Sequence, residues 1–281
     1  MIKLIDEAPG YTTHLLDEML HSIFFLGKVN DPKFSPESIL MDKDLLRRLR
    51  ELFPRAFELF SSHLPRRSPF SCVLEMIVLL KGPSKEREIA RELRQLIIDL
   101  DPDSRQLIPS TLCVSYIANP DIQNPNKFYG VSMATNTGDS RRFVIAASCL
   151  YYWDEYVAGA VLTYYPKKQK KPDYDGTIQL PQGVRCQAFS LIEKRKTPPC
   201  LSCRNLFGLK AQDVSVYGNC AENESLSNLF RNEVMVKEQV ERPTYSEPMM
   251  NRYKCEMRNN LRNNLRLKQF TWRAGDFYSP S

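Results

Sequence analysis

Two short cysteine motifs hold the residues whose types and spacing could do chemistry. In TPPCLSC, two residues separate Cys200 from Cys203, and an apolar pattern of helical period follows and ends at Gly208. In NCAENESLSNLF, Cys220 stands two residues before Glu222, at the start of another helical pattern. Thiolates at the start of a helix are stabilised by its unpaired N–H groups and by its dipole. The two motifs therefore predict reactive or metal-binding thiols.

Three thiolates with a carboxylate nearby are the groups needed for zinc-assisted hydrolysis. Three protein ligands hold the metal and leave a fourth position open for water. Zinc lowers the pKa of that water towards 7. A Glu that is not a ligand takes the proton and returns it to the ring nitrogen and the leaving amine of a nucleobase. Together the motifs predict hydrolytic deamination with zinc as the cofactor.

Other interpretations of the same thiols remain open. Cys255 could join the cysteines of the two motifs in a closed, four-cysteine structural zinc site. Glu222 would then be an ordinary acidic residue, favoured in a first helical turn by the helix dipole. A redox CxxC belongs after the first strand of a βαβ unit, whereas this one comes late in the chain. The alternative function is a non-catalytic intracellular interaction protein with a structural zinc or no metal.

The motifs also carry a family resemblance. PCLSC resembles the PCxxC zinc motif of the cytidine deaminase superfamily, and NCAENESLSNLF resembles the CAE helix of its bacterial toxin-type members. The resemblance covers residues 127–240 and implies a mixed sheet flanked by helices, with both motif helices beginning at the zinc. It implies zinc ligands at Cys200, Cys203 and Cys220, and Glu222 as the catalytic proton shuttle. The implied substrate is a cytosine or adenine base, free or in nucleic acid.

The order of the motifs is the reverse of the order in that family. There the CAE helix comes first and PCxxC follows, whereas here PCLSC comes first. A zinc site depends on geometry and not on chain order, so adjacent helices in a permuted order can build the same centre. A rival alignment keeps the family order by using Arg185-Cys186-Gln187-Ala188 as the first motif. That alignment predicts a protein that binds zinc but lacks the catalytic Glu.

The elements around the motifs predict an α/β protein with an α-helical N-terminal region. Apolar residues recur at helical spacing in the first hundred residues, which favours a helical region over residues 1–108. Beyond Pro109 the pattern changes, and we expect an α/β domain over residues 109–281. Cysteines in apolar runs are expected to be buried thiols: Cys72, Cys113 and Cys149.

Short runs rich in β-branched and aromatic residues predict strands in the second region. The turn signal NTGDS, residues 136–140, predicts a hairpin, and the resemblance implies that residues 128–135 and 142–149 are its two strands. Residues 186–193 fit either a strand or a short helix. The predicted strands are residues 111–118, 128–135, 142–149, 156–165, 177–180, 213–218 and 233–240.

The C-terminal residues 249–273 predict a long basic helix. Its apolar positions recur every four residues and should pack on the domain: Tyr253, Met257, Leu261 and Leu265. Beside them, Arg258, Arg262 and Arg266 form an arginine ridge, with Trp272 close by. Such ridges bind phosphates, and aromatic rings stack on bases. These four residues are the candidate nucleic-acid contacts, and a solvated helix face is the alternative.

Composition limits the class of protein. The chain has 281 residues and a net charge of +6, which is compatible with an acidic partner. Its 11 glycines form no phosphate-binding loop, which disfavours nucleotide triphosphate chemistry. The sequence has no long apolar run and no secretory signal at MIKLIDEAPG. We expect an intracellular protein, cytoplasmic or nuclear, without a membrane partner, whose N-terminal helices could bind a protein.

Overall fold

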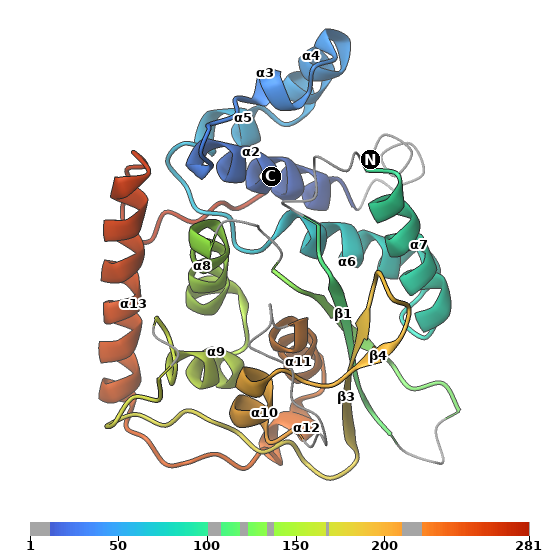
Figure 1. Cartoon of the computed structure of the whole chain (residues 1–281), viewed down its shortest axis with the longest axis vertical. Helices are drawn as coiled ribbons and strands as arrows, with labels where there is room; N and C mark the ends of the chain where they lie inside the picture. The colour runs from blue at the N-terminus through green and yellow to red at the C-terminus, as the bar shows by residue number, and fades with distance from the viewer. Residues whose placement is uncertain are drawn as a thin grey trace. The chain divides into compact units, whose positions relative to one another are not determined.

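The structure is a computed structural model that describes residues 12–100, 108–118, 123–133, 138–166, 169–209 and 221–280 (Figure 1). The chain divides into two compact units. Unit 1 contains Met1–Met76, Thr137–Tyr152 and Arg258–Ser281, and unit 2 contains Ile77–Asn136 and Trp153–Met257. Each unit is built from segments that are distant in sequence, and the division at residue 108 stays a prediction.

Unit 1 is helical, as predicted for the N-terminal region. Pro54 begins a new helix, because its fixed φ suits a first helical position, and Leu49 packs the preceding helix into the core. The longest helix of the region buries Leu15, Phe24 and Phe25 completely. The helices of this unit are α2 (Thr13–Val29), α3 (Pro36–Ile39), α4 (Lys43–Leu52), α5 (Pro54–Leu59), α8 (Gly138–Ala147) and the π-helical turn η3 (Ser148–Tyr152).

Two further helices cross the boundary between the units. They are α6 (Pro69–Lys81) and α13 (Glu247–Leu267). The long basic helix predicted near the C-terminus is therefore confirmed as α13. Its apolar stripe of Tyr253, Met257, Leu261 and Leu265 is buried, as the four-residue spacing predicts.

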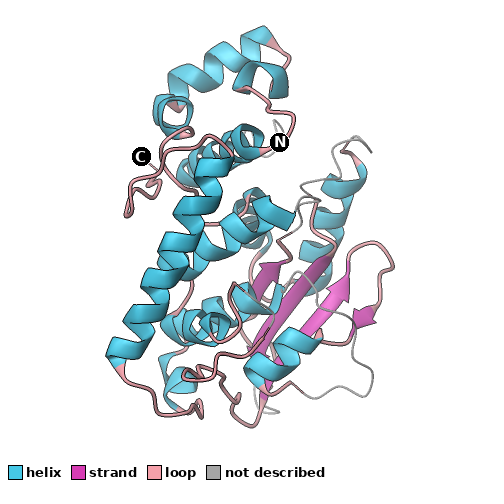
Figure 2. Cartoon of the chain, turned by 60° about the vertical axis from the view of Figure 1, so that its left-hand side comes forward, coloured by secondary structure: helices cyan, strands magenta, loops and turns pink. Residues whose placement is uncertain are grey.

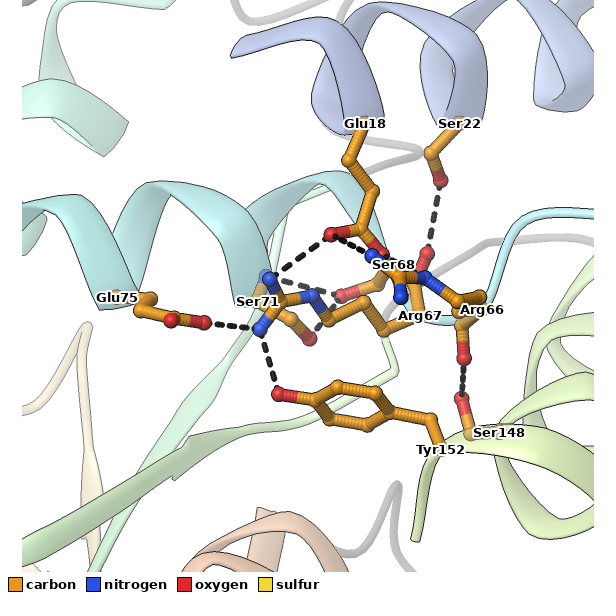
Figure 3. A network of polar contacts seen from close by, with 9 residues as sticks. All are labelled: Glu18, Ser22, Arg66, Arg67, Ser68, Ser71, Glu75, Ser148 and Tyr152. Carbon is orange, nitrogen blue, oxygen red and sulfur yellow. Dashed lines mark hydrogen bonds and ion pairs between the residues drawn. The ribbon is translucent and has the colours of Figure 1, made fainter. Parts of the chain in front are cut away.

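A polar network surrounds Arg67 inside unit 1 (Figure 3). The guanidinium of Arg67 donates to Glu18 at 2.9 Å, to the Tyr152 hydroxyl at 2.6 Å and to the carboxylate of Glu75. Arg66 donates to both carboxylate oxygens of Glu18 at 3.1 Å. Burial alone would raise the pKa of Glu18, but the charges and hydrogen bonds of Arg67 and Arg66 outweigh it and lower that pKa. The network ties α2 to the start of α6 and to η3.

The C-terminal segment is docked into unit 1 at Tyr278. This side chain is fully buried, and its ring stacks on the His21 ring with a centroid distance of 3.8 Å. Its hydroxyl donates to a carboxylate oxygen of Asp17 at 2.5 Å. The backbone N–H of Tyr278 donates to the Leu64 carbonyl at 2.8 Å, and the Leu64 N–H donates to the Asp276 carbonyl at 3.0 Å.

Among its described residues, unit 2 contains one four-stranded antiparallel sheet (Figure 2). The strand order is β2-β1-β3-β4. The predicted α/β class is confirmed, but the predicted mixed sheet is wrong for the described strands, because every pair in it is antiparallel. The strands are β1 (Thr111–Ile117), β2 (Phe128–Val131), β3 (Val184–Ser190) and β4 (Lys196–Thr197).

A helix packs closely over β1 and β2 at Gly130. A Cβ on Gly130 would lie 2.5 Å from the Ala221 carbonyl oxygen and 2.5 Å from the Ser225 nitrogen, so only glycine permits this approach. The buried carboxylate of Glu224 accepts a hydrogen bond from the Val131 N–H at 2.9 Å. The helices of unit 2 are α7 (Glu86–Ile98), α9 (Glu155–Leu162), α10 (Leu201–Phe207), α11 (Ala221–Asn232) and α12 (Val234–Glu238).

Three of the predicted strands are helical. Residues 142–149 lie in α8 and η3, so the hairpin implied by the family resemblance is wrong, and β2 pairs with β1 instead. Residues 156–165 contain all but the first residue of α9, and residues 233–240 contain α12. A short, wholly apolar run does not distinguish a strand from a buried helix by periodicity. For α9 the overlooked signal is Asp154, whose side chain caps the helix by accepting from the Tyr156 N–H.

The remaining strand predictions have different outcomes. Residues 186–193 lie largely in β3, so the strand alternative is confirmed. Within residues 177–180 the structure has one isolated bridge, between Gln179 and Glu241. The predicted strand at residues 213–218 lies outside the described residues, as do residues 136 and 137 of the predicted turn, whereas residues 138–140 of that turn begin α8.

Candidate active site

The PCLSC motif forms the start of α10, as its sequence predicts. Cys200 is the N-cap residue, and its sulfur accepts a hydrogen bond from the backbone N–H of Cys203 at 3.5 Å. Both side chains are buried. The helix ends at Gly208, which adopts the left-handed conformation with φ of 60°. The two thiols therefore lie together at the N-terminal, electropositive end of a short helix.

Glu222 lies in the first turn of α11 and is 5% exposed. Burial raises the pKa of Glu222 to about 7, although a hydrogen bond from its own backbone N–H acts to lower that pKa. The charge of Cys200 raises the pKa further, and a hydrogen bond from the Cys203 thiol lowers it. Cys220, the third expected thiolate, lies outside the described residues.

The fold thus brings the described residues of the two sequence motifs together. The Cys200 and Cys203 side chains both interact with the Glu222 carboxyl, although they come from different helices. A carboxyl with a pKa near 7 can accept and release a proton at neutral pH. Perturbed carboxyls of this kind are enriched at functional sites. The arrangement can therefore combine thiolate chemistry with proton transfer.

Two further cysteines form a pair, and one of them, Cys113, interacts electrostatically with Glu222. The sulfur atoms of Cys113 on β1 and Cys186 on β3 are 3.5 Å apart. Burial, the hydrogen bond with Cys186 and the charge of Glu222 all raise the pKa of Cys113. The apolar run around Cys113 predicts its burial, which is confirmed, but it does not predict this pairing, because the pairing depends on the register of two strands.

The rival alignment finds no structural counterpart in this region. Its first motif, residues 185–188, lies inside β3, whereas the family motif opens a helix. Cys186 projects from the middle of a strand and therefore lacks the helix N-terminus that the alignment requires.

The described residues contain part of the expected ligand set. Within residues 12–100, 108–118, 123–133, 138–166, 169–209 and 221–280, no group of three or more His, Cys, Asp or Glu side chains is placed to hold a metal ion. Cys200 and Cys203 supply two buried thiols, and the third expected ligand is Cys220. Cys255 is exposed on α13 and does not join them, which removes the four-cysteine alternative for the described thiols.

The candidate nucleic-acid contacts differ in exposure. Arg266 is exposed, whereas Arg258 and Arg262 are half-buried on α13. Trp272 is 3% exposed, and its ring nitrogen donates to the Asp276 carbonyl at 3.0 Å. The prediction that Trp272 offers a ring for base stacking is therefore corrected, because its ring is used in packing. The arginine ridge stays a prediction.

A separate hollow of about 460 Å³ lies on unit 2. Charges of its lining are paired, since Lys170 pairs with Asp175 at 2.5 Å and Asp173 pairs with Arg252, outside the lining, at 3.3 Å. Neither Glu222 nor the cysteines belong to its described lining. The lining consists of residues 170–175, residues 243–246 and Met249.

Comparisons of the chain with protein-family profiles, with curated proteins and with solved structures gave no match. The interpretation of the site therefore depends on this chain's own residues and on the motif resemblance. No helix within the described ranges is both long enough and apolar enough to cross a membrane.

Proposed function

We propose that this chain is a zinc-dependent hydrolytic deaminase that acts on a cytosine or adenine base, free or in nucleic acid. The observation that supports it most strongly is the meeting of Cys200 and Cys203 with Glu222. Metal-binding thiols beside a carboxyl that transfers protons are the pairing that this hydrolysis requires. The proposed fold of unit 2 is deaminase-like, in keeping with the resemblance of PCLSC and CAE to that superfamily.

Zinc is the proposed cofactor, with Cys200, Cys203 and Cys220 as its ligands. Cysteine sulfur is a preferred zinc ligand, and two residues between cysteines is a usual spacing. Both cysteines of PCLSC lie at the start of α10, and zinc would hold them as thiolates. When bound, zinc would supply the activation of a water molecule for attack on the ring carbon.

Glu222 is the proposed proton shuttle. Its carboxylate takes a proton from the attacking water and passes it to the ring nitrogen, and a second transfer delivers a proton to the leaving amine. The exocyclic amino group of the base is thereby replaced by a carbonyl oxygen from water, and ammonia is released. The Glu222 carboxyl lies against Cys203, and burial keeps bulk water from competing for the protons.

Ammonia release from cytidine, adenosine and single-stranded oligonucleotides tests this function. Glu222→Gln keeps the size of the side chain but cannot shuttle protons, so it should lower kcat/KM by about 10²–10⁴-fold. Glu224→Gln is the matched control, because it changes a second buried carboxyl on α11 whose amide oxygen can still accept from the Val131 N–H. We expect this control to keep activity within a few-fold of the parent protein.

Two results would contradict the proposal. One is the absence of ammonia release from every substrate by zinc-loaded protein. The other is a Glu222→Gln protein as active as its parent, since the proton shuttle would then lie elsewhere. A positive result with oligonucleotides alone would place the substrate base in nucleic acid.

A further inference from the structure

Cys113 and Cys186 form a close pair of thiols on neighbouring strands. β1 and β3 are antiparallel, with Cys113 opposite Ala188 and Ser115 opposite Cys186. The two cysteines therefore lie on the same face of the sheet in diagonal positions, since side chains two residues apart share a face. Their sulfur atoms are 3.5 Å apart and both are free thiols.

The two thiols differ in access to solvent. Cys186 is partly exposed, whereas Cys113 is fully buried. Burial is the largest cause of the raised pKa of Cys113, which keeps this thiol protonated. A dissolved oxidant can therefore reach Cys186 first, and the Cys113 sulfur lies within reach of the oxidised product. Accessible thiols beside a second cysteine are the usual form of redox-sensitive sites.

We propose that Cys113 and Cys186 are a site of reversible oxidative modification, in which a peroxide converts them to a disulfide that joins β1 to β3. The Cys186 thiolate attacks one oxygen of hydrogen peroxide, which breaks the O–O bond and gives Cys186 sulfenic acid and, after protonation, water. The Cys113 sulfur then attacks the sulfenic sulfur, and its proton leaves with the hydroxyl group as a second water. Two thiols and one peroxide become one disulfide and two waters.

The register of the strands favours a bond that is readily reduced. Diagonal residues in an antiparallel pair are ordinarily farther apart than residues directly opposite, so bonding requires a small local movement of the strands. Disulfides formed under such strain are the labile kind. Two small thiols such as glutathione restore Cys113 and Cys186 by thiol–disulfide exchange and become one disulfide themselves.

The pair lies against the first turns of α11. Ser225 of α11 contacts β1 through the hydroxyl of Ser115 at 2.8 Å, and it also hydrogen-bonds to the thiol of Cys113. Cys113 also interacts electrostatically with Glu222. Formation of the disulfide would remove the hydrogen of the Cys113 thiol and would move β1 relative to the first turns of α11. An effect on catalysis depends on the proposed deaminase function, whereas formation of the disulfide does not.

Mass spectrometry of the full chain tests the modification directly. The protein is treated with hydrogen peroxide, its remaining thiols are alkylated, and the digest is searched for a peptide joined through Cys113 and Cys186. We expect this peptide to appear, and to disappear when glutathione is added before alkylation. Cys255→Ser removes an exposed thiol away from the pair and should leave the cross-link unchanged.

Cys186→Ser is the informative variant, because the residue is partly exposed and its replacement should not disturb folding. It should abolish the cross-link and leave Cys113 unmodified at the same peroxide dose. The proposal is overturned if the wild-type protein forms only a Cys200–Cys203 disulfide, or if Cys186 proceeds to sulfinic acid while Cys113 remains free. Because the readout is a peptide mass, its failure is separate from a failure of the deaminase assay.

Discussion

The Cys203 thiol donates a hydrogen bond to the carboxyl of Glu222, and this contact joins the first turns of α10 and α11. Each residue belongs to a motif that can be recognised in the sequence, yet neither motif specifies that the other lies beside it. The contact is what turns two separate helix starts into one candidate site. The first turn of α11, which holds Glu222, packs directly against the sheet at Gly130.

Gly130→Ala should disturb the candidate site, because Gly130 lies on β2 where the first turn of α11 packs against the sheet. The new Cβ would overlap the Ala221 carbonyl and the Ser225 nitrogen, so the first turn of α11 must move. We expect a loss of about 1–3 kcal/mol in the free energy of unfolding, measured in urea, together with loss of the proposed deaminase activity.

Gly183→Ala is the control for this change. Gly183 has a φ of 95°, so alanine strains the backbone there, but the new Cβ meets nothing closer than 4.0 Å. It should lower stability while leaving kcat/KM within a few-fold of the parent. Equal losses of activity in both variants would mean that the close packing of α11 on β2 affects activity only through stability.

Breaking the network around Arg67 should destabilise unit 1. Glu18→Gln removes the carboxylate that faces both Arg66 and Arg67. The Arg67 side chain, which is 5% exposed, then keeps the Glu75 carboxylate but loses the buried one. Removing one member of a buried ion pair costs about 3–5 kcal/mol. Guanidinium unfolding of the variant should show a loss of this size.

The control is Glu37→Gln, which removes an ion pair with Arg50 whose side chains are 54% and 53% exposed. Exposed pairs contribute about 0–1 kcal/mol, so this variant should unfold near the midpoint of the parent. If the two variants lost the same amount, the Arg67 network would contribute no more than a surface pair.

His21 should make stability fall in mild acid. Burial lowers the pKa of His21 from 6.5 to about 3, while the ring stacks on Tyr278. Between these values the unfolded chain binds a proton that the folded chain does not, so unfolding is favoured as the pH falls. The contribution of this one group changes by about 1.4 kcal/mol per pH unit below pH 6.5.

His21→Phe removes the titration and keeps an aromatic ring against Tyr278. The difference in unfolding free energy between variant and parent should grow in the variant's favour from neutral pH down to about pH 5. In that range the Glu18 carboxylate stays ionised, because its pKa lies below the ordinary value of 4.5. A difference that does not change with pH would contradict a buried, neutral His21.

Neutralising the arginine ridge should weaken electrostatic binding of nucleic acid. Replacement of Arg258, Arg262 and Arg266 by Gln is expected to lower affinity for single-stranded DNA and to make its salt dependence shallower. Each phosphate that the variant no longer neutralises reduces the slope of log K against log salt by about 0.7. The Lys triple variant keeps the charges and should keep the slope. An unchanged slope in the Gln variant would support a solvated helix face.

Sequence patterns predicted the elements whose periodicity is strong. The stripe from Tyr253 to Leu265 predicted a helix and its buried face, and Gly208 marked the end of α10. Periodicity failed where helices are apolar on all sides, as in α9, because every position then resembles a buried strand. It also failed for Trp272, since composition does not reveal which side of a segment is buried.

The candidate site was predictable only in part. The positions of Cys200, Cys203 and Glu222 at helix starts follow from local signals such as the cap and the preceding prolines. The pairing of Cys113 with Cys186 does not, because it depends on the register of β1 and β3. Such contacts are set by packing between distant segments, which a single sequence does not display.

Zinc content per chain tests the proposed centre most directly. The wild-type protein, purified without chelators, should carry about one zinc by plasma mass spectrometry, as expected for a three-cysteine site. Cys203→Ser should lose that zinc, whereas Cys255→Ser, which changes an exposed thiol on α13, should keep it. A wild-type protein without zinc, or a Cys203→Ser protein with as much zinc as its parent, would contradict a zinc centre at the start of α10.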